Sequence, residues 1–134
     1  MKYWCGLTLE VNGQGEKLVD SLLNIVKKNG IKIQYDTAVT ELIYKKKIVC
    51  GVKILHKKKI KKIFSKSVIL ACGGFESSSK MRKKHLGVGW EAAKVRGTRH
   101  NTGDGLSMAL KIGAMPFGNW SGCHAVFHDM NGPE

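Results

Sequence analysis

The sequence predicts an α/β fold in which a parallel sheet is combined with an antiparallel three-stranded meander. The apolar, β-branched run at residues 68–72 stops at Gly73 and Gly74, which is typical of a strand buried on both faces of a parallel sheet. Upstream, an amphipathic helix leads directly into an alternating strand. Between this alternating strand and the run at 68–72, three strand-like runs are joined by lysine-rich turns that are too short for parallel crossovers.

The first 34 residues are expected to contain a short strand, a turn, a helix and a second strand. Residues 7–11 predict a short strand or an extended loop, and residues 12–15 predict a turn. Residues 16–29 predict a helix, which Gly30 ends at its C′ position after two lysines that suit the negative end of the helix dipole. Ile31 and Ile33 alternate with polar residues, so residues 31–34 predict a strand. The apolar stripe of the helix consists of Leu18, Val19, Leu22, Leu23 and Val26.

The meander is expected at residues 39–44, 48–56 and 60–64, and its turns contain much of the positive charge. The chain has 23 Lys and Arg against 10 Asp and Glu, a formal net charge of +13. The lysine clusters at 45–47 and 57–59 flank one strand, so they lie roughly 25 Å apart at about 3.3 Å per residue. That separation exceeds the Debye length of about 8 Å at physiological salt, and no aromatic residues alternate with the lysines. We therefore expect solvated turns and no nucleic-acid partner.

The second half of the chain predicts two short helices separated by an irregular segment. Residues 77–79 form a loop or N-cap for a helix that ends at Leu86, and residues 87–101 have no clear periodicity. The sequence Thr102-Gly103-Asp104-Gly105 begins the second helix, with Leu106, Ala109 and Leu110 at helical spacing. Asp104 is expected to act as its N-cap, and Gly113 as its terminator.

The cysteines and the hydropathy pattern indicate a protein without a metal site or a membrane span. Cys5, Cys50, Cys72 and Cys123 have neither metal-ligand nor disulfide-framework spacing, so reduced thiols in a cytoplasmic protein are the simple account. Cys123, His124 and His128 lack an evident fourth ligand for zinc. No apolar run reaches the length of about 20 residues that crosses a bilayer, and no signal peptide is evident.

Several motifs in a fixed order resemble a known family. They are Gly13-Gln14-Gly15 ahead of a helix, the segments 35–42 and 49–52, the run 68–75, and Thr102-Gly103-Asp104-Gly105. The chain resembles the flavoproteins of the fumarate reductase and succinate dehydrogenase superfamily over nearly its whole length. The segments 94–98, 101–105 and 118–124 look closest to its tricarballylate dehydrogenase branch.

The resemblance implies a flavin-dependent oxidoreductase that binds FAD and passes a hydride between the flavin and a small carboxylate substrate, with an electron-transfer partner that the sequence does not identify. Residues 1–134 would be a partial FAD-binding domain, and residues from about 115 to 134 would approach the substrate-capping region. The family's Gly-x-Gly-x-x-Gly pyrophosphate motif, its catalytic arginine and its carboxy-terminal half are not found here. Of two similar patterns, the one at 13–18 has Leu18 at the third glycine position, and the one at 87–92 follows a polar, basic segment instead of a strand. The alternatives are an inactive split-gene remnant and a basic α/β binding module.

The resemblance also assigns roles to individual residues. Ala38 and Val39 match positions whose backbone binds the adenine, and Asp104 matches an aspartate that contacts FAD. The usual Ala-Thr-Gly-Gly motif is present with one change, as Ala71-Cys72-Gly73-Gly74. His124 matches a histidine that binds a substrate carboxylate. Arg96 and Arg99 could also hold an anion, although a solvated loop is the simpler account.

Overall fold

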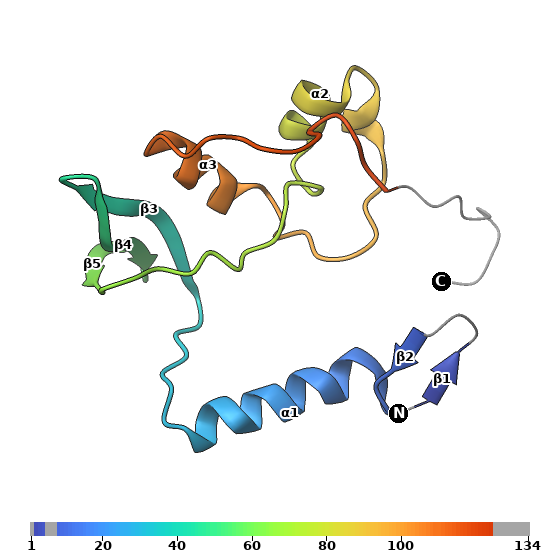
Figure 1. Ribbon diagram of the computed structural model, residues 1–134, viewed down its shortest axis with the longest axis horizontal. Helices are drawn as coiled ribbons and strands as arrows, with labels where there is room; N and C mark the ends of the chain where they lie inside the picture. Colours follow the sequence, from blue (N-terminus) through green and yellow to red (C-terminus); the bar gives the residue numbers. More distant parts are fainter. Residues whose placement is uncertain (1, 5–7, 125–134) are drawn as a thin grey trace. The chain divides into compact units, whose positions relative to one another are not determined.

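The computed structural model describes residues 2–4 and 8–124, which belong to two compact units, 1–36 and 37–134 (Figure 1). In the first unit, β1 (Lys2–Trp4) and β2 (Thr8–Glu10) form an antiparallel pair with Tyr3 opposite Leu9. The prediction of a strand near residues 7–11 is thus confirmed for residues 8–10. Helix α1 (Gln14–Lys28) follows, beginning two residues earlier than predicted.

The end of α1 follows the sequence prediction, but the prediction of a strand after it was wrong. Gly30 has a φ of 66° and its N–H donates to the carbonyl of Lys27 at 3.0 Å, as a C′ glycine does. Residues 31–35 have no regular structure, because no strand among the described residues pairs with them. No residue of α1 is buried, and Leu22 on its apolar stripe is 53% exposed.

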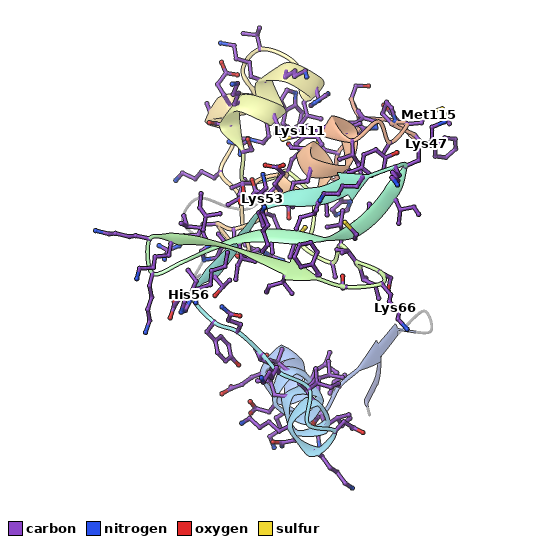
Figure 2. The ribbon with its side chains drawn as sticks, turned by 90° about the vertical axis from the view of Figure 1, so that its left-hand side faces the viewer. Lys47, Lys53, His56, Lys66, Lys111 and Met115 are labelled. Atoms are coloured by element: carbon purple, nitrogen blue, oxygen red, sulfur yellow. The ribbon has the colours of Figure 1, made fainter. Side chains whose placement is uncertain are left out.

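The second unit contains the predicted meander. Strands β3 (Thr37–Lys45), β4 (Ile48–His56) and β5 (Lys59–Phe64) pair antiparallel in the order β3-β4-β5. Two-residue turns of lysine join them, and all four turn residues have positive φ values between 47° and 64°. This is the type I′ geometry that matches the twist of a hairpin, although Asn-Gly adopts it more easily than Lys-Lys. Lys47 and His56 lie at opposite ends of the sheet (Figure 2).

The core of this unit is small and lies between the sheet and helix α3 (Asp104–Lys111), which contacts β3. The strands β4 and β5 approach closely at Gly51, where a Cβ atom would lie 2.1 Å from the carbonyl oxygen of Ile63. A glycine is therefore required at this point of the sheet. The buried apolar side chains of the described residues are Leu42, Ile43, Ile54 and Met108.

The parallel sheet predicted from residues 68–72 was wrong. These residues form no strand, and Ile69 is 89% exposed. A strand of a parallel sheet is stabilised by hydrogen bonds to neighbours and by layers on both faces. The strands of the described residues pair only with one another, in two antiparallel sheets. Among the residues that the structure describes, the apolar run therefore has no neighbouring strand with which to form the predicted sheet.

Helix α2 (Ser79–Leu86) confirms the helix expected after the serine run. Ser78 is its N-cap and accepts a hydrogen bond from the backbone N–H of Met81 at 3.3 Å. A single 3₁₀ turn, η1 (Trp90–Ala92), interrupts the segment expected to be irregular. Within the described part of the chain, no helix combines the length and the apolar character needed to cross a bilayer.

Candidate cofactor site

The two glycine-containing motifs that the sequence analysis assigned to the cofactor lie next to each other. The backbone N–H of Gly103 donates to the carbonyl of Gly74 at 2.9 Å. A Cβ atom on Gly105 would lie 2.3 Å from the thiol sulfur of Cys72, so the first turn of α3 packs directly on the residue before the glycine pair. Residues 72–74 and 103–105 therefore form one local site, although they are about 30 residues apart in sequence.

Asp104 begins helix α3, but it is not the N-cap that the sequence predicted. That position belongs to Gly103, whose φ of 82° is left-handed, and no side chain caps the helix. Asp104 Oδ2 instead accepts a hydrogen bond from the Thr102 hydroxyl at 2.8 Å. The carboxylate is exposed in the first turn, where the helix dipole favours a negative charge. The predicted terminator is confirmed, because Gly113 has a φ of 92° and its N–H donates to Leu110.

The structure shows a second constraint that requires glycine at position 73. Its φ is 73°, and an added Cβ would lie 2.5 Å from Oδ1 of Asn101. A Cβ on Gly74 would lie 2.8 Å from a carboxylate oxygen of Glu76. Besides the expected approach of a ligand, neighbouring protein side chains also exclude a larger residue at these two glycines.

An aromatic cluster joins the segment at 117–124 to this site. Phe75 stacks on Trp120 with ring centroids 6.1 Å apart and an interplanar angle of 18°, and His85 of α2 contacts both rings. The indole N–H of Trp120 donates to the carbonyl of Phe117 at 3.0 Å, which fixes the local turn. His124 follows four residues after Trp120 and is exposed. The cluster thus tethers the segment that contains the predicted substrate residue.

Arg82 in helix α2 organises the neighbouring loop through backbone carbonyls. Its side chain is buried, with 7% of the residue exposed. Nε donates to Trp90 at 2.8 Å and Nη1 donates to Glu76 at 2.6 Å. Nη2 donates to Glu91 at 2.8 Å and to Ala93 at 3.2 Å. The guanidinium fork therefore holds the segment after α2 and the loop after the glycine pair together.

The remaining predicted site residues lie elsewhere in the second unit. Ala38 and Val39 are at the start of β3, opposite Leu55 and Ile54, and take no part in the hydrogen bonds around Gly74 described above. Ala71 is exposed in the irregular segment before Cys72. His128 lies outside the described residues. No group of three or more potential metal ligands occurs in the part of the chain that the structure describes.

A small hollow of about 140 Å³ lies between β3 and α3. It is smaller than the cavities of about 300–1,000 Å³ that enclose typical small-molecule ligands, so it does not fit a dinucleotide. Beside it, Lys53 Nζ lies 3.0 Å from both carboxylate oxygens of Glu41. The hydrogen bond from Lys53, together with its charge and that of Lys111, lowers the pKa of Glu41. The hollow is lined by Glu41, Leu42, Tyr44, Met108, Lys111 and Ile112.

Sequence reasoning missed the residues that assemble the site. These residues act through contacts with other segments of the chain, which no local sequence pattern encodes. They are Glu76, Arg82, Asn101 and Trp120. One signal was present, because Arg82 is the only arginine of α2, in a helix where the other basic residues are lysines and a histidine. A planar guanidinium is favoured over an ammonium where several carbonyls must be bound at once.

Comparison with known proteins places the chain in a flavoprotein family. The family described as "FAD binding domain" matches residues 6–129, and the chain belongs to this family. It is similar to 3-oxosteroid 1-dehydrogenase of Mycobacterium tuberculosis (strain ATCC 25618 / H37Rv), with 32% identity over 108 residues, covering 76% of this chain and 19% of that protein. It is also similar to NADH:fumarate oxidoreductase of Klebsiella pneumoniae (strain 342), with 30% identity over 103 residues, covering 75% of this chain and 11% of that protein.

Solved structures give the same relationship. An open conformation of a flavocytochrome c3 fumarate reductase matches with a TM-score of 0.72 and 27% identity, over 77% of this chain and 18% of that chain. The 3-ketosteroid delta1-dehydrogenase of Sterolibacterium denitrificans matches with a TM-score of 0.65 and 27% identity, over 69% of this chain and 17% of that chain. The chain therefore spans about a fifth or less of the length of these relatives. Its relatives are flavoprotein oxidoreductases with more than one kind of substrate.

Proposed function

We propose that this chain binds FAD at the Gly73–Gly74 turn and at Asp104, as part of a flavin-dependent oxidoreductase. The observation that carries the proposal is the hydrogen bond from the Gly103 N–H to the Gly74 carbonyl. It joins the two motifs that the family resemblance independently assigns to the cofactor. When bound, FAD would supply the hydride acceptor or donor, and the protein would supply binding and orientation.

The donor and acceptor groups at the site fit a flavin dinucleotide. The exposed Asp104 carboxylate accepts one hydrogen bond from Thr102, and its remaining acceptor capacity suits the hydroxyl groups of a ribose or ribityl chain. Gly73 and Gly74 present backbone without side chains in the same place. We assign the backbone of Ala38 and Val39 to the adenine and Ala71 and Cys72 to the approach of the cofactor, on the resemblance alone.

The substrate proposed for the protein is a small carboxylate, and His124 is the residue assigned to bind it. The proposed reaction is tricarballylate dehydrogenase-like, on the resemblance of the segments 94–98, 101–105 and 118–124, or fumarate reductase-like. The electron partner is unassigned, and we propose a cytoplasmic location. A 3-oxosteroid is the second candidate substrate, because the 32% identity to a 3-oxosteroid dehydrogenase exceeds the 30% and 27% identities to the fumarate-reducing relatives.

A titration of the purified chain with FAD tests the cofactor proposal. Flavin fluorescence should change saturably, and Asp104→Ala should weaken binding about tenfold, the loss expected for a hydrogen bond to a charged acceptor. Glu91→Ala is the matched control, because it removes a carboxylate that pairs with Lys83 at 3.2 Å on α2. An inactive remnant or a basic binding module would show no saturable binding, and equal affinity in Asp104→Ala would remove this residue from the site.

A second titration tests the substrate proposal. With FAD present, tricarballylate or fumarate should shift the imidazole NMR signals of His124, while their uncharged amides should not. His124→Ala should weaken carboxylate binding about thirtyfold, the equivalent of about 2 kcal/mol for a charge-assisted hydrogen bond, and leave the FAD affinity unchanged. Binding of a 3-oxosteroid without any response to the carboxylates would favour the second candidate.

A further inference from the structure

Two polar side chains enclose the Gly73–Gly74 turn. The amide of Asn101 fills the position that a side chain on Gly73 would occupy, since a Cβ atom there would lie 2.5 Å from Asn101 Oδ1. The corresponding position at Gly74 faces a carboxylate oxygen of Glu76 at 2.8 Å. The turn is therefore bounded by an amide next to one glycine and by a carboxylate next to the other.

The two side chains also bind each other. Asn101 Nδ2 donates a hydrogen bond to Glu76 Oε1, across 25 residues of sequence. Backbone hydrogen bonds flank this contact, from Ser77 N–H to the Asn101 carbonyl and from Gly103 N–H to the Gly74 carbonyl, both at 2.9 Å. The Glu76–Asn101 pair thus lies between two backbone links that connect the glycine turn to the loop before α3.

We infer that Glu76 and Asn101 are positioning residues of the FAD site. They act through the Gly73–Gly74 turn and through the backbone that leads to Asp104, without touching the cofactor. The Asn101 amide occupies the space beside Gly73 and is held there by Glu76, so the left-handed φ of 73° at Gly73 is maintained before a ligand arrives. This inference rests on the proposed function, because the turn it orders is the proposed cofactor site.

The test separates the hydrogen bond from the charge. Glu76→Gln keeps an oxygen that accepts from the Asn101 amide, whereas Glu76→Ala and Asn101→Ala remove the contact. Glu41→Ala is the matched control, because it removes a carboxylate with its own hydrogen-bonded lysine on the sheet. Two quantities are measured on the full chain, namely amide hydrogen exchange at Ser77 and Gly103 by NMR, and FAD affinity by flavin fluorescence.

Glu76→Ala and Asn101→Ala should speed exchange at both amides about tenfold and weaken FAD about tenfold, the loss expected for one charge-assisted hydrogen bond. Glu76→Gln should lose much less than Glu76→Ala in both measurements, because it keeps a neutral acceptor for the Asn101 amide. The amides of β3 and β4 should report an intact sheet in every variant of the pair. If the wild type binds no FAD, the proposed function fails and the inference fails with it, whatever the exchange rates.

Two results would overturn the inference alone. The first is wild-type FAD affinity in Glu76→Ala while the wild type binds FAD, because the pair would then have no effect on the site. The second is a loss of affinity in Glu76→Gln as large as that in Glu76→Ala with unchanged exchange, because the carboxylate charge would then act on the ligand directly.

Discussion

Replacing Arg82 by alanine should release the loop at residues 87–93 while leaving the sheet intact. The guanidinium donates four hydrogen bonds to backbone carbonyls, of Glu76, Trp90, Glu91 and Ala93. A hydrogen bond from a charged donor contributes about 1.5–3 kcal/mol, and the simple sum overestimates the loss because carbonyls in an opened loop regain water. We therefore expect a local destabilisation of about 3 kcal/mol, the value of one or two such bonds.

The assay is limited proteolysis with trypsin, which cleaves after the basic residues at 94, 96 and 99. Cleavage follows the population of the open loop when opening and closing are fast, so about 3 kcal/mol predicts cleavage roughly 150-fold faster. Lys83→Ala is the matched control, since it removes a neighbouring cation whose side chain is 57% exposed and whose ion pair with Glu91 is at the surface.

The variant Arg82→Lys tests whether the planar guanidinium or only its positive charge holds the loop at residues 87–93. A lysine keeps the positive charge but cannot reach four carbonyls in one plane, so it should cleave nearly as fast as Arg82→Ala. Wild-type cleavage in Arg82→Lys would show that charge alone suffices. Wild-type cleavage in Arg82→Ala would refute the argument that these four bonds fix the loop.

Three further changes have predicted outcomes. Lys58→Gly should raise the free energy of unfolding by about 0.5 kcal/mol in urea denaturation, because glycine relieves a left-handed φ of 62° and loses part of that gain to chain entropy; a lower urea midpoint would contradict this reading of the turn. Gly103→Ala should destabilise by about 2–3 kcal/mol, since Gly103 has a left-handed φ of 82° and an added Cβ would lie 2.9 Å from the Cβ of Phe75. An unchanged midpoint would argue against that packing. Because the Lys53 pair lowers the pKa of Glu41, the ionised carboxylate stabilises the fold at pH values above the ordinary carboxyl pKa. This stabilisation is lost as the pH falls through the lowered pKa of the folded state. Glu41→Gln should therefore flatten the dependence of the free energy of unfolding on pH below about pH 5. An identical acid profile in both proteins would mean that the Lys53 pair contributes nothing.

The elements that sequence predicts well here are those whose stability is local. The middle strand of the meander was predicted with its observed bounds, Ile48–His56, because lysine turns of two residues delimit it on both sides. Helix α2 was predicted from a serine N-cap, and the structure shows the corresponding hydrogen bond from Met81. These features depend on neighbours within a few residues.

The failures and omissions depend on distant partners. The apolar run 68–72 looks like a buried strand, but hydrophobicity specifies only a preference for burial and does not provide the neighbouring strands. Asp104 was predicted as an N-cap because that residue type suits the position. Gly103, with a left-handed backbone, occupies the N-cap position instead, and the Thr102 hydroxyl donates a hydrogen bond to the Asp104 carboxylate. The contact between Glu76 and Asn101 could likewise not be predicted, because no helix or strand periodicity relates two residues that are 25 apart in sequence.

The binding mode of Arg82 has a consequence for how the loop at residues 87–93 can change over evolution. Three of its four acceptors are main-chain oxygens within that loop, of Trp90, Glu91 and Ala93, which every amino acid provides. The path of the loop is thus set mainly by one side chain outside it, to which the Glu91 carboxylate adds a hydrogen bond from the Gly89 N–H at 2.8 Å. Because the side chains of Trp90 and Ala93 take no part in these bonds, designed libraries at 90 and 93 should retain the loop conformation.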